Sequence, residues 1–186
     1  MRIFILVLIN LIAFNLSPFE ITHGERDIEY RSPETAVCEP GFKLSPGEVA
    51  GEMSIPVLDL ENAPLYYLPT RENLKNGPCM DGPEGGWQLV GEKGRSMIAA
   101  HNDKEFKNLD KMNSGDRVFV STEYGDFEFQ VESVRVYRQN TDDWKETAYE
   151  GAEEYGLALV TCYPLNKRNT TGDRLIVRCK RVSAST

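Results

Sequence analysis

A series of short strand-like segments separated by turn residues constrains the fold of this chain more than any other feature. Residues 127–136 alternate apolar and polar side chains along most of their length, which is typical of a half-buried β-strand. A second apolar segment, residues 117–122, precedes them, and Tyr-Gly-Asp at 124–126 separates the two. We predict that these two segments form a β-hairpin.

Further strand-like segments lie on both sides of this hairpin. We expect strands at residues 51–58, 64–68 and 97–101, one that ends at Cys162 and one that begins at Arg174. A short helix at 71–76, capped by Thr70, and a helical turn at 105–109 are the main helical signals. Residues 77–94 carry six Gly and two Pro and predict an irregular loop, and residues 139–156 predict a long acidic loop. Seven or eight short strands predict a mainly β domain, as a barrel or a sandwich.

The length and charge of the chain limit its class. A chain of 186 residues fits one domain with a real hydrophobic core. Its net charge of −8 argues against a nucleic-acid partner, because proteins that bind nucleic acids usually present a basic surface to them. Solubility is the simplest account of the acidity.

The N-terminal segment has a different composition. Met1-Arg2 is followed by a 14-residue apolar run at 3–16, which Asn10 and Asn15 interrupt. This is the length of a signal-peptide core, whereas a spanning helix needs about 20 apolar residues. We expect residues 1–21 to be an export signal, cleaved or kept as a membrane anchor; a buried strand or helix is the alternative.

Either export reading places the rest of the chain on the outer side of the cytoplasmic membrane. Residues 22–50 are polar and contain several Pro and Gly, so we expect them to form a linker arm. Residues 51–186 would then be the folded domain.

Four cysteines raise the question of disulfides and metals. The chain has no CxxC pair and no Cys/His cluster with zinc-ligand spacing, so we predict no metal site. Exported proteins often contain disulfides, and Cys38–Cys79 is the pair to test first.

Three residues at the ends of predicted strands could carry chemistry. Cys162 ends an apolar run, and Pro164 prevents simple continuation of that strand. His101 ends another run, and Arg174 opens a third, with Arg178 on the same face as the competing choice. A thiol, an imidazole and a guanidinium could be a nucleophile, an acid/base and an anion stabiliser. Taken singly, Cys162 is more often a structural cysteine and Arg174 a solvated strand-end residue, and His101 is as often an ordinary surface histidine.

The order and spacing of these residues resemble the sortase family of cysteine transpeptidases. That family has a Thr-Leu-x-Thr-Cys strand end, an arginine that opens an apolar strand after it, and a histidine roughly sixty residues before the cysteine. Here residues 158–162 read Ala-Leu-Val-Thr-Cys, His101 lies 61 residues earlier, and Arg174 opens Arg-Leu-Ile-Val. Residues 51–56, 74–78 and 98–116 match further family segments, so the resemblance covers about residues 50–182.

Four positions depart from the family pattern. Ala158 replaces the first threonine of the cysteine motif, and Cys79 stands where a histidine is frequent. Ala100 replaces a common glycine before the histidine, and Asn102 replaces a common arginine after it. The run Thr-Cys-Tyr-Pro is more similar to the class D and proteobacterial types than to class A.

The resemblance implies a closed eight-stranded β-barrel with short helices and long loops, and it implies an activity. Sortases cleave a Leu-Pro-x-Thr-Gly-like sorting signal between Thr and Gly. Cys162 would form a thioacyl enzyme, His101 would move protons, Arg174 would stabilise the oxyanion or bind the substrate backbone, and Thr161 would position substrate.

The implied partners are exported proteins with a C-terminal sorting signal and an amine acceptor, either a cell-wall precursor or a protein lysine. The enzyme would meet them at the membrane through its N-terminal segment. No cofactor is required. Calcium binding in an acidic loop is a minor alternative, through Asp142, Asp143, Glu153 and Glu154.

Two alternatives stay open on the sequence. One is another cysteine enzyme: a hydrolase of exported proteins, or a transpeptidase acting directly on peptidoglycan. The other is a catalytically idle, membrane-anchored barrel that serves as a binding module.

Overall fold

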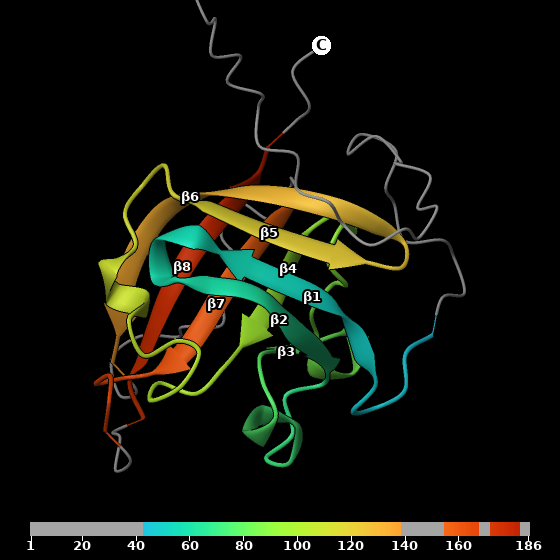
Figure 1. Ribbon diagram of the computed structural model, residues 1–186, viewed down its shortest axis with the longest axis horizontal. Coiled ribbons are helices and arrows are strands. Elements are labelled where there is room, and N and C mark those ends of the chain that lie inside the picture. The colour runs from blue at the N-terminus through green and yellow to red at the C-terminus, as the bar shows by residue number, and fades with distance from the viewer. Residues whose placement is uncertain (1–42, 139–154, 168–171, 183–186) are drawn as a thin grey trace, which may run out of the picture. The chain divides into compact units, whose positions relative to one another are not determined.

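Eight strands form a closed barrel in the order β1-β2-β3-β4-β7-β8-β6-β5 (Figure 1). The structure is a computed structural model that describes residues 43–138, 155–167 and 172–182. The strands are β1 (Val49–Ile55), β2 (Leu60–Tyr67), β3 (Cys79–Met80), β4 (Arg95–Ala99), β5 (Arg117–Thr122), β6 (Gly125–Tyr137), β7 (Gly156–Cys162) and β8 (Arg174–Arg181). Four short 3-10 helices connect them: η1 (Pro56–Leu58), η2 (Asn73–Lys75), η3 (Pro83–Gly85) and η4 (Leu109–Lys111).

The barrel combines antiparallel pairs with two parallel ones. β2 runs parallel to β3 and β4 runs parallel to β7, whereas the other neighbours are antiparallel. The predicted hairpin is confirmed as β5–β6, and the mainly β, closed-barrel fold is confirmed with it. β1, β2 and β5 lie in front of β4, β7 and β8 in the view of Figure 1.

Several predicted elements differ in detail from the structure. Residues 77–94 are not irregular throughout, because β3 and η3 lie within them. The predicted helix at 71–76 is only the 3-10 turn η2, although Thr70 Oγ1 does accept the N–H of Asn73 at 3.1 Å. The helical turn expected at 105–109 is assigned as η4, slightly later in the chain. β1 begins two residues earlier than expected.

Alternate residues of the strands pack into two separate hydrophobic clusters. Leu157 and Leu159 of β7 belong to the main cluster, which fills the barrel, while Ala158 and Val160 belong to a second cluster on its outer face. The second cluster consists of Trp87, Met97, Tyr137, Ala158, Val160 and Ile176. β7 is therefore buried on both faces, which explains why its sequence is a continuous apolar run rather than an alternating one.

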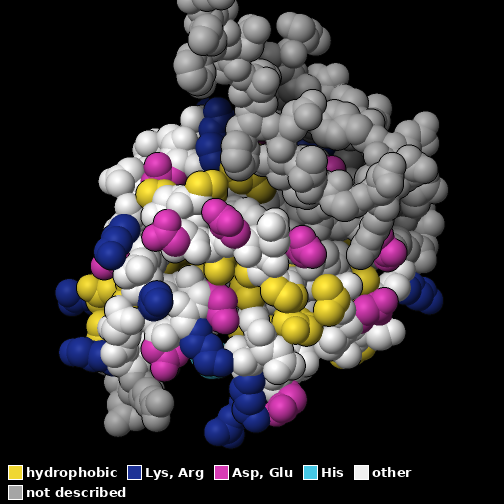
Figure 2. Space-filling model, in the orientation of Figure 1, with side chains coloured by type: hydrophobic (Ala, Val, Ile, Leu, Met, Phe, Trp, Pro, Cys, Tyr) yellow, Lys and Arg dark blue, Asp and Glu magenta, His cyan; other side chains and the backbone are white. Residues whose placement is uncertain are grey.

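The opposite side of the barrel faces solvent. Figure 2 shows acidic, basic and apolar side chains next to one another on the face formed by β1, β2 and β5. Phe119 of β5 and Val49 of β1 are among the exposed apolar side chains, at 39% and 55% exposure. This face therefore resembles an ordinary soluble-protein surface, where apolar atoms are common.

Some predictions fall on residues that the structure does not describe. The signal or anchor segment 1–21 and most of the linker arm 22–50 lie outside the described residues, as does most of the acidic loop 139–156. Within the described residues, no helix is both long enough and apolar enough to cross a membrane.

Gly51 marks the contact that closes the barrel between β1 and β5. It lies at a register shift in β1 with φ of +155°, and a Cβ atom there would come within 2.1 Å of the Ser121 carbonyl oxygen. Gly115 also has a positive φ, +101°, but a Cβ atom there would meet nothing within 4 Å. An alanine at position 51 would therefore bring both a steric clash and backbone strain, whereas an alanine at position 115 would bring backbone strain alone.

We predict that Gly51→Ala lowers the free energy of unfolding by about 3 kcal/mol, because β1 and β5 must move apart. Gly115→Ala should cost about 1 kcal/mol, from the left-handed backbone only. Urea denaturation of both variants measures the difference. Equal losses would show that β1 and β5 are not as close at Gly51 as the structure has them.

Candidate active site

Cys162 and Arg174 are direct partners across two antiparallel strands. Cys162 is the last residue of β7, Arg174 is the first of β8, and the β7–β8 register pairs them. Directly opposed residues of an antiparallel pair have Cβ atoms about 5 Å apart. Cys162 is half-buried and its thiol is free. The pairing therefore places the base of the Arg174 side chain beside Cys162, the only described cysteine that is not buried.

The same register separates Arg174 from its competitor. Arg178 pairs with Ala158, four residues before Cys162. At about 3.3 Å per residue this is roughly 13 Å along the strand. Arg174 therefore lies at the thiol, and Arg178 lies well away from it.

The parallel pair β4–β7 places His101 at the level of Cys162. The register aligns Ala99 with Val160, and the Ala100 N–H donates to the Val160 carbonyl at 3.3 Å. Extending this register by two residues brings His101 level with Cys162. The structure thus gathers His101, Cys162 and Arg174 at one end of three neighbouring strands, while their chemical roles remain predictions.

Thr161 joins the two strand ends at this point. It is 2% exposed, and its hydroxyl donates a hydrogen bond of 2.8 Å to the Ala100 carbonyl. Thr161 directly precedes Cys162 in the chain, and its hydrogen-bond partner Ala100 directly precedes His101. The Thr161 hydroxyl is thus engaged with the residue that follows β4. Positioning of substrate by Thr161 stays a prediction.

Hydrogen bonds to the preceding loop hold the Arg174 side chain. Nη1 donates to the carbonyls of Gly172 and Asp173, both at 2.9 Å, and the Tyr163 N–H donates to the Asp173 carbonyl at 3.0 Å. The guanidinium is therefore anchored on one edge, beside the residue that follows Cys162. Such an anchored cation is suited to meet negative charge that develops at the thiol.

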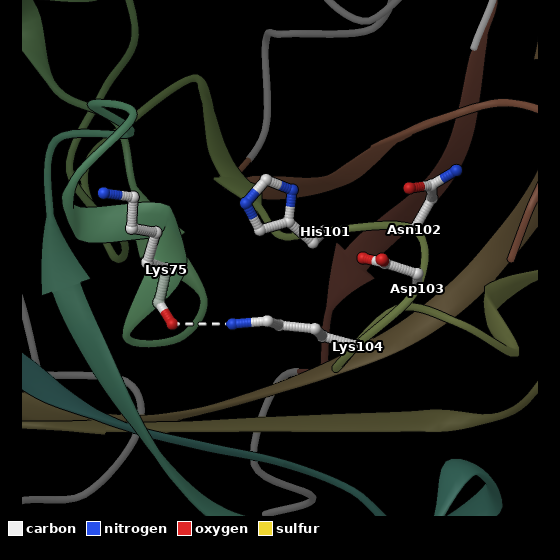
Figure 3. A pocket seen from close by; sticks show the side chains of 5 residues that line it. All are labelled: Lys75, His101, Asn102, Asp103 and Lys104. Carbon is white, nitrogen blue, oxygen red and sulfur yellow. Dashed lines mark hydrogen bonds between the residues drawn. The ribbon is translucent and has the colours of Figure 1, made fainter. Parts of the chain in front are cut away.

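A hollow beside His101 is lined by charged residues that sequence reasoning did not identify. Its lining residues are Lys75, His101, Asn102, Asp103 and Lys104 (Figure 3). Lys104 Nζ donates to the Lys75 carbonyl at 2.7 Å, which ties the turn after His101 to η2. Two lysines and one aspartate thus line the same hollow as the imidazole. Lysines in polar segments carry no sequence signal for this placement, because it depends on how η2 folds back.

The other two described cysteines are kept unreactive by burial. Cys79 and Cys179 are both 0% exposed free thiols. Burial raises the pKa of Cys79 to about 12, and the nearby Glu105 carboxylate adds to the rise. Burial likewise raises the pKa of Cys179 well above the usual range. A thiolate is the reactive form of cysteine, so neither residue suits nucleophilic chemistry near neutral pH.

The free thiol of Cys79 also bears on the proposed disulfide and metal chemistry. Cys79 is a free thiol in the described part of the chain, and its Sγ donates to the Gly77 carbonyl at 3.5 Å. Cys38 lies outside the described residues, as do the acidic residues at 142–143 and 153–154 that were considered for calcium. Among the described residues, no three His, Cys, Asp or Glu side chains cluster closely enough to hold a metal ion.

We predict that iodoacetamide at pH 8 modifies Cys162 much faster than Cys79 or Cys179. Exposure favours Cys162, whereas burial shields Cys79 from the reagent and raises its pKa to about 12. Peptide mapping after alkylation of the folded and the urea-unfolded chain measures the three rates. Rapid labelling of Cys79 in the folded chain would contradict the burial of β3.

Comparisons with known proteins match this chain to one family. The Sortase domain family model matches residues 53–182. A comparison with curated proteins found no match. Sortase C from Clostridium perfringens SM101 is similar at 26% identity over 75% of this chain and 73% of that chain, with a TM-score of 0.60. Sortase C1 of GBS pilus island 1 is 30% identical over 73% and 64% of the two chains, with a TM-score of 0.61.

A third similar structure and the range of classes complete the comparison. Streptococcus pneumoniae sortase C is 26% identical over 74% of this chain and 70% of that chain, with a TM-score of 0.61. Sortases named C, D and A all occur among the similar structures, so the likeness to class D and proteobacterial types stays a prediction. Because the family model matches most of the chain, including β4, β7 and β8, this protein belongs to the sortase family of cysteine transpeptidases.

Proposed function

We propose that this sortase cleaves a Leu-Pro-x-Thr-Gly-like C-terminal sorting signal between Thr and Gly and transfers the protein to an amine. The observation that carries the proposal is the register of β4, β7 and β8, which brings His101 and Arg174 to either side of Cys162. Clostridium perfringens sortase C, 28% identical to this chain, has been solved with the C-terminal cell wall sorting motif. That likeness supports a sorting signal as the substrate here.

The first half-reaction forms a thioester. The Cys162 thiolate attacks the threonine carbonyl, and the resulting oxyanion lies toward the Arg174 guanidinium. A free thiol near pH 7 is only a few per cent ionised, so a neighbouring base or cation increases the reactive fraction. As the tetrahedral intermediate collapses, the carbon–nitrogen bond breaks and His101 gives a proton to the departing glycine amine.

The second half-reaction returns the enzyme to its starting state. An incoming amine attacks the thioester, His101 takes the proton from that amine, and the Cys162 thiolate leaves. The acceptor is an amine of a cell-wall precursor or a lysine side chain of another protein. Without an amine, water would release the acyl group slowly, so hydrolysis is a side reaction of the same site.

The proposed setting is the outer side of the cytoplasmic membrane. The apolar run at residues 3–16 supports an export signal or anchor, and the substrates are themselves exported proteins. Retention of residues 1–21 as an anchor would hold the site where a protein with a sorting signal leaves the membrane. No metal or cofactor has a role in the proposed reaction.

We predict that Cys162→Ala and His101→Ala each abolish turnover of a Leu-Pro-x-Thr-Gly peptide, to below a few per cent of the wild-type rate. Arg174→Ala should lower kcat by about 10²–10³, because an oxyanion loses its cationic donor. Arg178→Ala is the matched control, and it should cost far less because Arg178 pairs with Ala158 rather than Cys162. Peptide cleavage followed by mass spectrometry measures all four.

The same assay separates the competing activities. Adding an amine acceptor should convert the product from a free acid to an amide and should speed release of the acyl group. An acid product that an amine neither replaces nor accelerates would identify a hydrolase. A larger effect of Arg178→Ala than of Arg174→Ala would move the oxyanion role to Arg178.

A further inference from the structure

Asn102, the residue after His101, is fastened to the loop that follows Cys162. It is 5% exposed, and its Nδ2 donates two hydrogen bonds, to the Pro164 carbonyl at 2.7 Å and to the Lys167 carbonyl at 2.9 Å. Its own backbone carbonyl accepts the N–H of Asn166 at 2.9 Å. Three hydrogen bonds thus cross between segments that lie more than sixty residues apart in the chain.

Thr161 makes the corresponding connection on the other side of the two reacting residues. Its hydroxyl donates to the carbonyl of Ala100, the residue before His101. Ala100, which precedes His101, is therefore hydrogen-bonded to Thr161, which precedes Cys162. The residue after the imidazole is bonded to the loop after the thiol, and together these contacts flank His101 and Cys162 on both sides.

The loop conformation fits this attachment. Asn166 has a φ of +57°, in the left-handed region that asparagine tolerates better than most residues. This conformation directs its N–H to Asn102, while its Nδ2 donates to the Lys107 carbonyl at 3.0 Å. The segment 163–167 is thereby held to the turn that follows His101 at two points.

Asn102 lines the hollow beside His101, but its amide nitrogen is engaged with the loop that follows Cys162. In Figure 3 the amide nitrogen of Asn102 points away from the imidazole and from Lys75 and Lys104, whereas its amide oxygen lies on the side of the imidazole. Asparagine is also short, so one nitrogen can satisfy two carbonyls only if the loop lies close to the end of β4.

We propose that Asn102 is a positioning residue that holds His101 beside Cys162, where it can exchange a proton with the leaving or incoming amine, by clamping the loop after the thiol to the segment that follows β4. This role rests on the proposed function. Proton transfer needs the imidazole within about 3 Å of the reacting group, and a misplacement of about 1 Å can lower a rate by roughly 10²-fold. Asn102 acts through the backbone of the two segments that it joins.

Two substitutions test the clamp. Asn102→Asp keeps the size of the side chain but replaces the donor nitrogen by an oxygen, which repels the Pro164 and Lys167 carbonyls. Asn102→Ala removes both hydrogen bonds. The control is Asn113→Ala, which also removes an amide-to-carbonyl hydrogen bond, to Lys111 at 2.9 Å, but in an exposed turn away from the site.

The expected result is a fall in kcat by about 10- to 100-fold in both Asn102 variants, with KM within about threefold of wild type. The pH profile of kcat should also change, because the imidazole no longer exchanges its proton in the same geometry. Asn113→Ala should retain wild-type kcat and pH profile. Rates are measured well below the melting temperature of each variant, so that loss of folded protein does not contribute.

Hydrogen–deuterium exchange supplies a measurement that does not depend on turnover. The Asn166 amide should exchange about tenfold faster in Asn102→Asp than in the wild type, whereas Asn113→Ala should leave it unchanged. Wild-type kcat in Asn102→Asp, or a loss confined to KM, would overturn the proposal. If the wild-type chain cleaves no sorting peptide, the proposed function fails. The clamp is then supported by faster exchange and overturned by unchanged exchange.

Discussion

The parallel pairing of β4 with β7 is the contact on which the site depends. It aligns five consecutive residue pairs, from Arg95 with Gly156 to Ala99 with Val160, and so fixes the level at which the two strands end. A shift by one residue would turn each side chain to the opposite face. Burial of β7 on both faces, in the barrel and in the outer cluster, opposes any such shift. The position of His101 relative to Cys162 is therefore a consequence of packing along the whole length of the strands.

The antiparallel pairing of β7 with β8 adds the cation to this arrangement. It makes Arg174 the cross-strand partner of Cys162, while hydrogen bonds from Arg174 to the preceding loop hold the guanidinium in place. Beyond the strand ends, side-chain hydrogen bonds rather than sheet pairing hold the segments together. Thr161 and Asn102 connect the segments around the imidazole to those around the thiol. Rigid strands and short polar contacts thus combine to place three groups that are distant in sequence.

Local patterns predicted much of this fold, but they could not predict contacts between distant residues. The β5–β6 hairpin follows from alternation and a turn, and the ends of β7 and β8 follow from apolar runs next to polar residues. β3 has only two residues, which is too short for any periodicity, and its pairing with β2 and β4 is what makes it a strand. Alternation placed Arg174 and Arg178 on one face, and only the register distinguishes them. Asn102 was visible as a departure from the family pattern, but its bonds to Pro164 and Lys167 depend on tertiary structure.

The central claim is that Cys162 carries the acyl group, and intact-mass spectrometry tests it most directly. The chain is mixed with a Leu-Pro-x-Thr-Gly peptide without an amine acceptor and quenched in acid at short times. We predict an added mass equal to that of the peptide acid that ends at threonine less one water, located on Cys162 by peptide mapping and released by hydroxylamine. An adduct on any other residue, or peptide cleavage that persists in Cys162→Ala, would contradict the account.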